Sequence, residues 1–344
     1  MSFSPMNGVR AVSRRRVVRG IAVSAVAVAA AGLLAACGGA AGGSASAAAS
    51  DKVQVVASFY PMADFAQKVG GDHVEVTNLV PAGTEPHEWE PSPKDITKIQ
   101  SAQVFVYNGA GMEGWVDDAL ESTDTSKVQV VEASKGLDLL PGEDDHEHEG
   151  EGEEATEGES SDEHAHEENE YNPHVWLYPV YAKREMENIK DARVKADPDH
   201  KDDYEANYKK YADEFDQLDK DYKEQIAAAK GKTLVVSHDA YGYLAKAYGL
   251  ETKPIAGMDA EGEPDAKTMA QIIDYVKANN VKVIFSEDLV SPKVAQQIAD
   301  ATGAECKVLN PLEGLTDEQL KDGEDYVSVM KSNLKEIVDA LNKE

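Results

Sequence analysis

The chain has 344 residues, of which 42% are hydrophobic, and its formal net charge at pH 7 is -30. A chain of this length can build two domains of ordinary size. Its acidic balance excludes a nucleic-acid-binding protein, because such a surface repels phosphate backbones and attracts cations.

The first 37 residues have the pattern of an export signal. A basic start precedes an apolar run over 21–36, which is too short and too rich in alanine to favour a spanning helix. The run ends in "LLAAC", which resembles the bacterial lipobox, so we expect Cys37 to be acylated and to anchor the chain to a membrane. Residues 38–50 are expected to be a flexible tether. Cys306, the second cysteine, is expected to be a buried strand residue.

Strands alternate with helices from residue 51 onward. Short β-branched runs occur at 53–59, 74–80, 104–109 and 128–134, and the same rhythm returns after residue 232. This alternation predicts parallel sheets, so the expected fold class is α/β with two lobes, at 51–180 and 233–344. In such sheets, ligands collect in the crevice outside the carboxyl ends of the strands.

The region between the lobes, 181–232, is expected to contain one long, rigid helix. Apolar and aromatic residues recur there at steps of three and four, which predicts an amphipathic helix from about 198 to 230. At about 1.5 Å rise per residue, such a helix would reach across both lobes and join them.

An acidic insert interrupts the first lobe at 141–170. It carries fifteen Asp and Glu residues and neither Lys nor Arg, so we expect it to be disordered. Two H-x-H pairs within it offer imidazole ligands for weak capture of a divalent metal: His146, His148, His164 and His166. The alternative is a solvated acidic spacer in which these histidines have no role.

Three histidines lie in loops or at strand ends. His87 follows the second strand in "GTEPHEWEPSP", His174 follows the insert in "NPHVWLYP", and His238 ends the strand "LVVSHD". Each alone could be a structural histidine. Together they favour a metal site, because crossovers return distant residues to the same sheet edge and neutral imidazole is a common zinc ligand.

Six segments then resemble, in order, the zinc and manganese solute-binding proteins of bacterial ABC transporters, of the ZnuA and AdcA type. They are "PAGTEPHEWEPSPKDI", "NPHVWLYP", "VVSHDAYGYLAKAYGL", "GMDAEGEPDAKTMAQII", "VIFSED" and "LNPLEGLT". The resemblance implies that His87, His174 and His238 are the metal ligands and that Glu313 is the fourth, with Glu287 as the alternative. Glu85 and Asp239 are expected to orient or tune these ligands.

The resemblance implies an extracytoplasmic, membrane-anchored receptor that passes metal to a membrane ABC permease with its cytoplasmic ATPase, and that is a monomer. Three nitrogens and one carboxylate suit Zn²⁺ better than Mn²⁺, which prefers more oxygen ligands. Three alternatives stay open: a manganese-binding relative, a secreted zinc-dependent hydrolase and a surface adhesin. An enzyme is not expected, because the sequence lacks H-E-x-x-H, G-x-S-x-G and a Walker loop.

Overall fold

The computed structural model describes residues 52–142 and 171–343. The predictions for Cys37, the tether and His146, His148, His164 and His166 lie outside these residues. Among the described helices, none has the length and apolar character needed to cross a bilayer.

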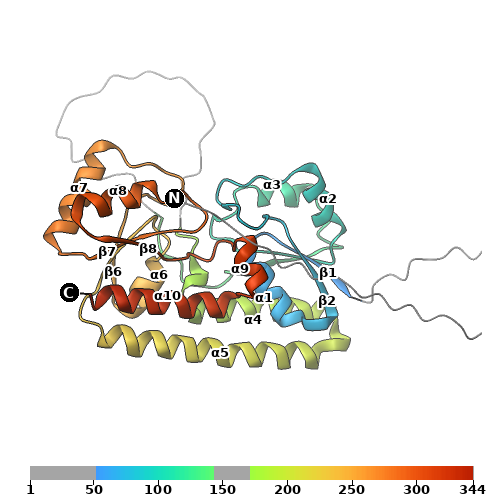
Figure 1. The fold of residues 1–344 in the computed structure, drawn as a ribbon. Helices are drawn as coiled ribbons and strands as arrows, with labels where there is room; N and C mark the ends of the chain where they lie inside the picture. The colour runs from blue at the N-terminus through green and yellow to red at the C-terminus, as the bar shows by residue number, and fades with distance from the viewer. Residues whose placement is uncertain (1–51, 143–170, 344) are drawn as a thin grey trace, which may run out of the picture. The chain divides into compact units, whose positions relative to one another are not determined.

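Each lobe contains one parallel sheet of four strands, as the sequence predicts (Figure 1). The first has the order β2-β1-β3-β4, and the second has the order β6-β5-β7-β8. The two orders are equivalent, so the second lobe repeats the topology of the first. The strands are β1 Val53–Ala57, β2 Val74–Asn78, β3 Val104–Tyr107, β4 Gln129–Glu132, β5 Thr233–Val236, β6 Glu251–Pro254, β7 Val283–Ser286 and β8 Glu305–Val308.

Helices connect the strands within each lobe. Those of the first lobe are α1 Tyr60–Gly70, α2 Pro93–Ser101 and α3 Val116–Glu121. Those of the second are α6 Gly242–Tyr248, α7 Ala266–Ala278, α8 Lys293–Thr302, α9 Asp317–Asp322 and α10 Tyr326–Leu341. Short 3-10 helices lie at Gly71–His73, Val175–Leu177 and Pro198–His200.

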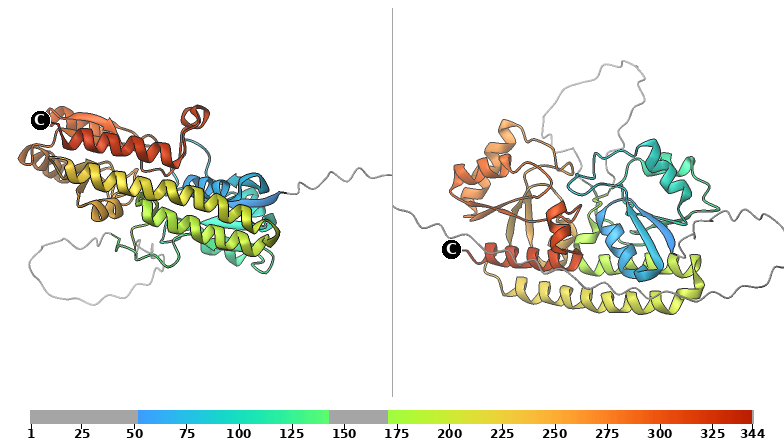
Figure 2. Two further views of the ribbon diagram at one scale, coloured as in Figure 1. Left: turned by 90° about the horizontal axis from the view of Figure 1, so that it is seen from below. Right: turned by 45° about the vertical axis from the view of Figure 1, so that its right-hand side comes forward.

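Two helices, rather than one, join the lobes. They are α4, Pro179–Ala196, and α5, Lys201–Ala228, which pack against each other. Helix α5 runs beneath both lobes and contacts α1 of the first and α10 of the second (Figures 1 and 2). One buried hydrophobic cluster extends from the helices of the first lobe through α4 and α5 to those of the second. It includes Phe65, Met186, Phe215, Leu244 and Leu334. The lobes therefore share a core.

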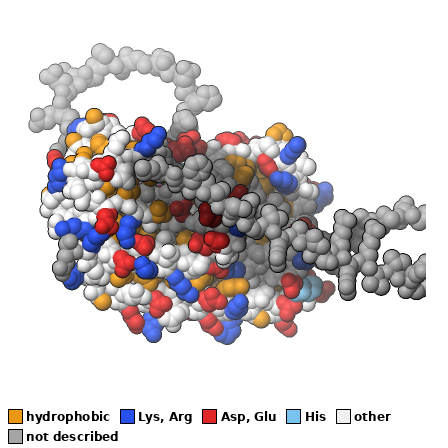
Figure 3. All heavy atoms as spheres, in the orientation of Figure 1, with side chains coloured by type: hydrophobic (Ala, Val, Ile, Leu, Met, Phe, Trp, Pro, Cys, Tyr) orange, Lys and Arg blue, Asp and Glu red, His pale blue; other side chains and the backbone are white. Residues whose placement is uncertain are grey.

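Charges of both signs alternate on the face that Figure 3 presents. Exposed ion pairs one helical turn apart occur in the structure, such as Lys209 with Asp213 and Lys335 with Asp339. Exposed pairs of this kind contribute little to stability, so the fold depends mainly on its core. Cys306 lies in β8, half-buried against a cluster beside the second sheet.

Candidate metal site

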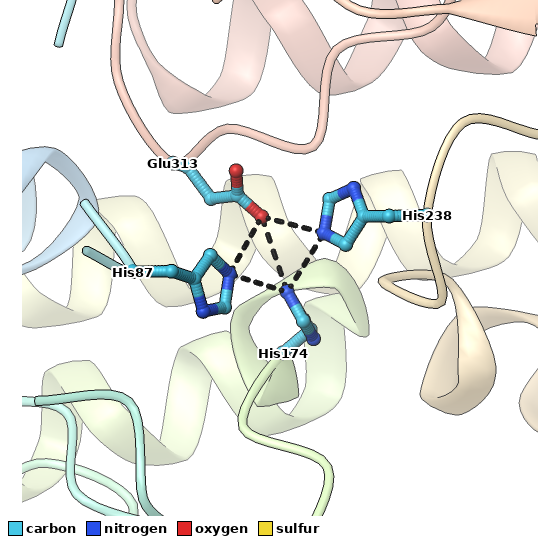
Figure 4. A group of neighbouring side chains, drawn as sticks. All are labelled: His87, His174, His238 and Glu313. Atoms are coloured by element: carbon cyan, nitrogen blue, oxygen red, sulfur yellow. Dashed lines mark hydrogen bonds and ion pairs between the residues drawn. The ribbon is translucent and has the colours of Figure 1, made fainter. Parts of the chain in front are cut away.

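Four side chains from separate parts of the chain point at one another between the lobes: His87, His174, His238 and Glu313 (Figure 4). Each offers one ligand atom, and these atoms all lie within 4.8 Å of one another. Within 52–142 and 171–343, no other group of three or more His, Cys, Asp or Glu residues meets this condition. The structure thus brings the four residues singled out in the sequence together at one point.

The loop after β2 carries His87. The Glu85 carboxylate accepts hydrogen bonds from the backbone N–H of His87, at 3.0 Å to either oxygen, and from that of Glu88 at 3.3 Å. The loop contacts the second lobe through Gly83, whose N–H donates to the Leu315 carbonyl at 3.0 Å. Glu85 therefore orders the backbone that carries His87.

His174 precedes the short helix Val175–Leu177 and is fully buried. The side-chain oxygen of Asn172 lies 2.9 Å from Nδ1 of His174, which leaves Nε2 directed at the other three ligand atoms. Trp176, two residues further on, donates its indole N–H to the Pro311 carbonyl at 2.8 Å. The segment that carries His174 is thereby tied to the loop that carries Glu313.

His238 lies just beyond the carboxyl end of β5, where the topology predicts a ligand crevice. Its Nδ1 is 2.6 Å from Oε1 of Glu287, and its Nε2 faces Glu313 at 3.0 Å. A carboxylate on the far nitrogen of a ligating imidazole fixes the ring orientation and strengthens the imidazole as a donor. Glu287 therefore contacts Nδ1 of His238, whereas Glu313 lies beside Nε2, where the four ligand atoms meet.

A tightly bonded loop after β8 carries Glu313. The Asn310 side chain accepts the N–H of Leu312 at 2.6 Å, and Asn333 brackets Asn310 with bonds to its N–H and its carbonyl. Leu312 has φ of 58°, a left-handed conformation that costs a non-glycine residue energy. Such strain next to a buried carboxylate indicates that the loop is shaped to place Glu313.

The four groups differ in their tendency to hold a proton. Burial lowers the pKa of His174 to about 3, so its imidazole is neutral. Burial alone would also lower the pKa of His238, but Glu313 and Glu287 outweigh it and raise that pKa well above the ordinary value. The pKa of His87 is raised in the same way, since the bond and charge of Glu313 overcome its burial. Burial opposes ionisation of Glu313, yet the charge of His238 and the hydrogen bonds from His238 and His87 hold its pKa well below normal.

The spacing of the donors suits a tetrahedral cation. Five of the six donor separations are 3.0–3.4 Å. Bonds of about 2.0–2.2 Å to a tetrahedral Zn²⁺ would place the donors about 3.3–3.6 Å apart, so these five pairs need shifts of only a few tenths of an ångström. The sixth pair, His87 with His238, lies within 4.8 Å. The side chains of His174, His238 and Glu313 are at most 1% exposed, whereas that of His87 is 10% exposed. A dication bound here would be almost completely dehydrated.

Sequence reasoning missed the roles of Asn172 and Asn310, and it treated Glu287 only as an alternative ligand. Asp239 donates its backbone N–H to Gly257 and accepts the Asn172 amide at its carbonyl. Asparagine followed by proline in "NPH" is a turn signal that could have pointed to Asn172. Nothing in the sequence reveals which carboxylate faces which imidazole nitrogen.

Comparison with known proteins identifies the family of the chain. The family model described as the zinc-uptake complex component A, periplasmic (ZnuA), matches residues 55–340. The chain belongs to the ZnuA family. The high-affinity zinc uptake system protein ZnuA of Bacillus subtilis (strain 168) is 43% identical to this ZnuA-family chain over 309 residues, covering 90% of it and 94% of the relative.

Two further relatives extend the ZnuA likeness to lipoproteins and to a solved structure. The zinc-binding lipoprotein AdcA of Streptococcus pneumoniae (strain ATCC BAA-255 / R6) is 40% identical over 300 residues, covering 86% of this chain but only 57% of AdcA. The crystal structure of the Zn(II)-bound ZnuA-like domain of Streptococcus pneumoniae AdcA is 38% identical, with a TM-score of 0.71, covering 85% of this chain and all of that domain.

Proposed function

We propose that this chain is an extracytoplasmic receptor that binds Zn²⁺ through His87, His174, His238 and Glu313 and delivers it to a membrane ABC permease with a cytoplasmic ATPase. The observation that carries the proposal is the convergence of three imidazole Nε2 atoms and one carboxylate oxygen at a buried point between the lobes. Family membership and the names of the zinc-uptake relatives support the transport role.

The donor set favours Zn²⁺ as the cargo over Mn²⁺. Zinc has no ligand-field preference, accepts four donors in a tetrahedron and binds imidazole well, whereas manganese suits oxygen-rich octahedral sites. Here nitrogen donors outnumber oxygen donors by three to one. We expect the mature chain to act outside the cytoplasm, anchored through acylated Cys37, and to act as a monomer.

A binding role also fits this donor set better than hydrolysis does. A catalytic zinc site keeps one coordination position for water and places a general base beside it. Four protein donors occupy every position of a tetrahedral ion. Glu287, a further carboxylate beside the site, contacts Nδ1 of His238 at 2.6 Å rather than the point where the four ligand atoms meet.

Binding requires the site to give up protons. Because the pKa of His238 is raised well above its ordinary value and that of His87 is also raised, protons compete with a cation for both rings. His174 is neutral and Glu313 is ionised, so these two groups are ready to ligate. Acidification therefore favours release of the cargo and weakens its uptake.

Competition titrations with a chromophoric zinc chelator would test the proposal. The wild-type chain should take up one Zn²⁺ tightly, and His238→Ala and Glu313→Gln should each lose most of that affinity. Glu287→Gln should lose less, about 10- to 100-fold, because it removes a supporting carboxylate rather than a ligand. His73→Ala is a matched control, since His73 bonds Asp203 outside the cluster. Wild-type affinity in His238→Ala would exclude this residue as a ligand, and a wild-type chain without a tight site would overturn the function.

A further inference from the structure

Asn172 makes hydrogen bonds with four different parts of the structure, although it is only 2% exposed. Its backbone N–H donates to the Leu140 carbonyl at 2.9 Å, and its carbonyl accepts the Tyr243 hydroxyl at 2.7 Å. Its side-chain oxygen contacts His174, and its side-chain nitrogen donates to the Asp239 carbonyl at 2.9 Å. No polar atom of this residue is left unpaired.

Backbone groups fix the orientation of the Asn172 amide. The backbone N–H of His174 donates to Oδ1 at 3.0 Å, and a backbone N–H can only donate. The Asp239 carbonyl lies 2.9 Å from Nδ2 and can only accept. Rotating the amide by 180° would set two donors together at one end and two acceptors together at the other. The oxygen must therefore face His174.

That orientation determines the tautomer of His174. Oδ1 of Asn172 has no proton to give, so Nδ1 of His174, 2.9 Å away, must carry the hydrogen. In a neutral imidazole, a hydrogen on Nδ1 leaves the lone pair on Nε2. Nε2 is the atom that lies 3.1 Å from both Glu313 and Nε2 of His238. The ring is thus held in the form that can accept a cation.

The same side chain connects His174 to the second lobe. The Asp239 carbonyl belongs to the residue that follows His238, so one amide joins the segments of two ligands. The Tyr243 hydroxyl, from α6, adds a second link, because it accepts the Leu140 N–H at 2.9 Å and donates to the Asn172 carbonyl. The segments of His174 and His238 are therefore fixed relative to each other by bonds that involve neither ligand's Nε2.

We propose that Asn172 is a positioning residue of the metal site, which holds His174 in the tautomer with Nε2 free and ties that ligand to the segment carrying His238. The proposal rests on the proposed zinc-binding function and adds a residue that determines affinity without touching the ion. Oδ1 of Asn172 determines the tautomer of His174, and Nδ2 determines the spacing between the segments that carry His174 and His238.

Two substitutions separate these tasks. Asn172→Ala removes both contacts and should weaken Zn²⁺ binding about 10- to 100-fold, the range found for groups that support ligating histidines. Asn172→Asp keeps an oxygen acceptor against His174 but sets a second acceptor against the Asp239 carbonyl, so it should keep the tautomer and recover only part of the lost affinity. Asn188→Ala is the matched control, because the Asn188 amide also bonds two backbone carbonyls, those of Ala133 and Lys135, outside the four-residue site.

The tautomer is read directly in the full-length, metal-free protein from long-range ¹H–¹⁵N correlations of the His174 ring. Wild type, Asn172→Asp and Asn188→Ala should show the hydrogen on Nδ1, whereas Asn172→Ala should populate the form with hydrogen on Nε2. Because this measurement needs no zinc, it tests the inference even if the wild-type chain binds none. Unchanged tautomer and affinity in Asn172→Ala would overturn the proposal, as would equal losses in both variants with the tautomer unchanged. If Asn172→Ala does not fold, Asn172→Asp with Nε2 protonated would be the overturning result.

Discussion

His174 differs from its two partner histidines in the direction of its pKa shift. It is buried with one neutral hydrogen-bond acceptor behind it, whereas a carboxylate, Glu287, lies behind His238. Burial therefore dominates at His174 and gives a pKa of about 3, while carboxylates dominate at His238 and raise its pKa. One cluster thus contains a histidine that resists protonation beside one that retains its proton.

His174 should destabilise the metal-free protein on mild acidification. Its unfolded pKa is about 6.5, so below that pH the unfolded chain binds a proton that the folded chain refuses until about pH 3. The slope for one such group approaches about 1.4 kcal/mol per pH unit, giving a loss on the order of 2 kcal/mol between pH 6.5 and 5. Urea unfolding of chelator-treated protein at the two pH values measures this loss.

His174→Gln is the control, because it removes only this titration. Glu113, whose pKa burial raises to about 6, gains its proton over the same pH range in both proteins, so the difference between them isolates His174. The other three groups contribute little in this window. His87 and His238 have raised pKa values, so below pH 6.5 they are protonated in both states, and their stabilising contribution is lost only as pH rises through their folded pKa. Glu313, with a lowered pKa, loses its contribution only below its unfolded value of about 4.3. If the free energy of unfolding depended on pH equally in wild type and in His174→Gln, the lowered pKa of His174 would be contradicted.

The sequence predicts the convergence of His87, His174 and His238 because each follows a strand or lies in a connecting loop, and topology brings such positions together. It does not distinguish Glu287 from Glu313 on physical grounds. Both are carboxylates near strand ends, and only the fold sets one against Nδ1 of His238 and the other against Nε2. The preference for Glu313 came from family resemblance.

At the scale of elements, the strands were predicted within a few residues of their bounds. The run expected at 53–59 forms β1, Val53–Ala57, and the run at 74–80 forms β2, Val74–Asn78. The overestimates arise because the apolar pattern continues into buried loop positions such as Phe59 and Val80.

The linking helices were predicted less completely. The helix expected from about 198 to 230 corresponds to α5, but α4 was not distinguished as a separate helix. Its buried face includes Glu185 and Arg193, both 0% exposed, which interrupt the apolar pattern that a sequence reading depends on. The sequence pattern therefore predicts α5, whose buried residues are mostly aromatic and aliphatic. It does not predict α4 as a separate helix.

Phe215 of α5 should be a major contributor to the shared core. Its ring is 1% exposed and makes edge-to-face contacts with Phe65 of α1, at 5.9 Å, and with Tyr326 of α10, at 5.1 Å between ring centroids. One side chain thus packs against both lobes. Phe215→Ala should lower the free energy of unfolding by about 3–5 kcal/mol, because it removes buried surface and leaves a cavity.

Denaturant unfolding followed by circular dichroism measures this change. Lys209→Ala, an exposed change on the same helix, should cost less than about 0.5 kcal/mol. Phe215→Leu fills part of the cavity and should fall between the two. A cost below about 1 kcal/mol for Phe215→Ala would mean that the core relaxes around the missing ring and that α5 does not hold the lobes together.

Residues 52–142 and 171–343 together show why a buried site forms between two similar lobes. Both sheets have parallel strands in equivalent order, and loops at strand ends supply His87 from the first lobe and His238 and Glu313 from the second. The third histidine, His174, comes from the connection between the lobes. Each part holds only some of the donors, so a complete site exists only when α4, α5 and their shared core keep the lobes in register.

The segment 143–170 should be dispensable for the four-residue site. Its flanks are joined by a bridge between Pro141 and Tyr171 and by the bond from Asn172 N–H to the Leu140 carbonyl, so a short Gly-Ser linker can replace it. The replacement variant should keep the wild-type affinity for the first Zn²⁺, because none of the four donors lies in the segment. It should lose the weaker sites that we expect from His146, His148, His164 and His166, and with them any zinc bound beyond one equivalent. Isothermal titration of both proteins would separate the two classes of site.

Changing the four histidines to alanine within the full-length chain is the matched control and should give the same one-site isotherm. Loss of the tight site in either variant would mean that the segment, and not only the lobes, completes the coordination of the ion.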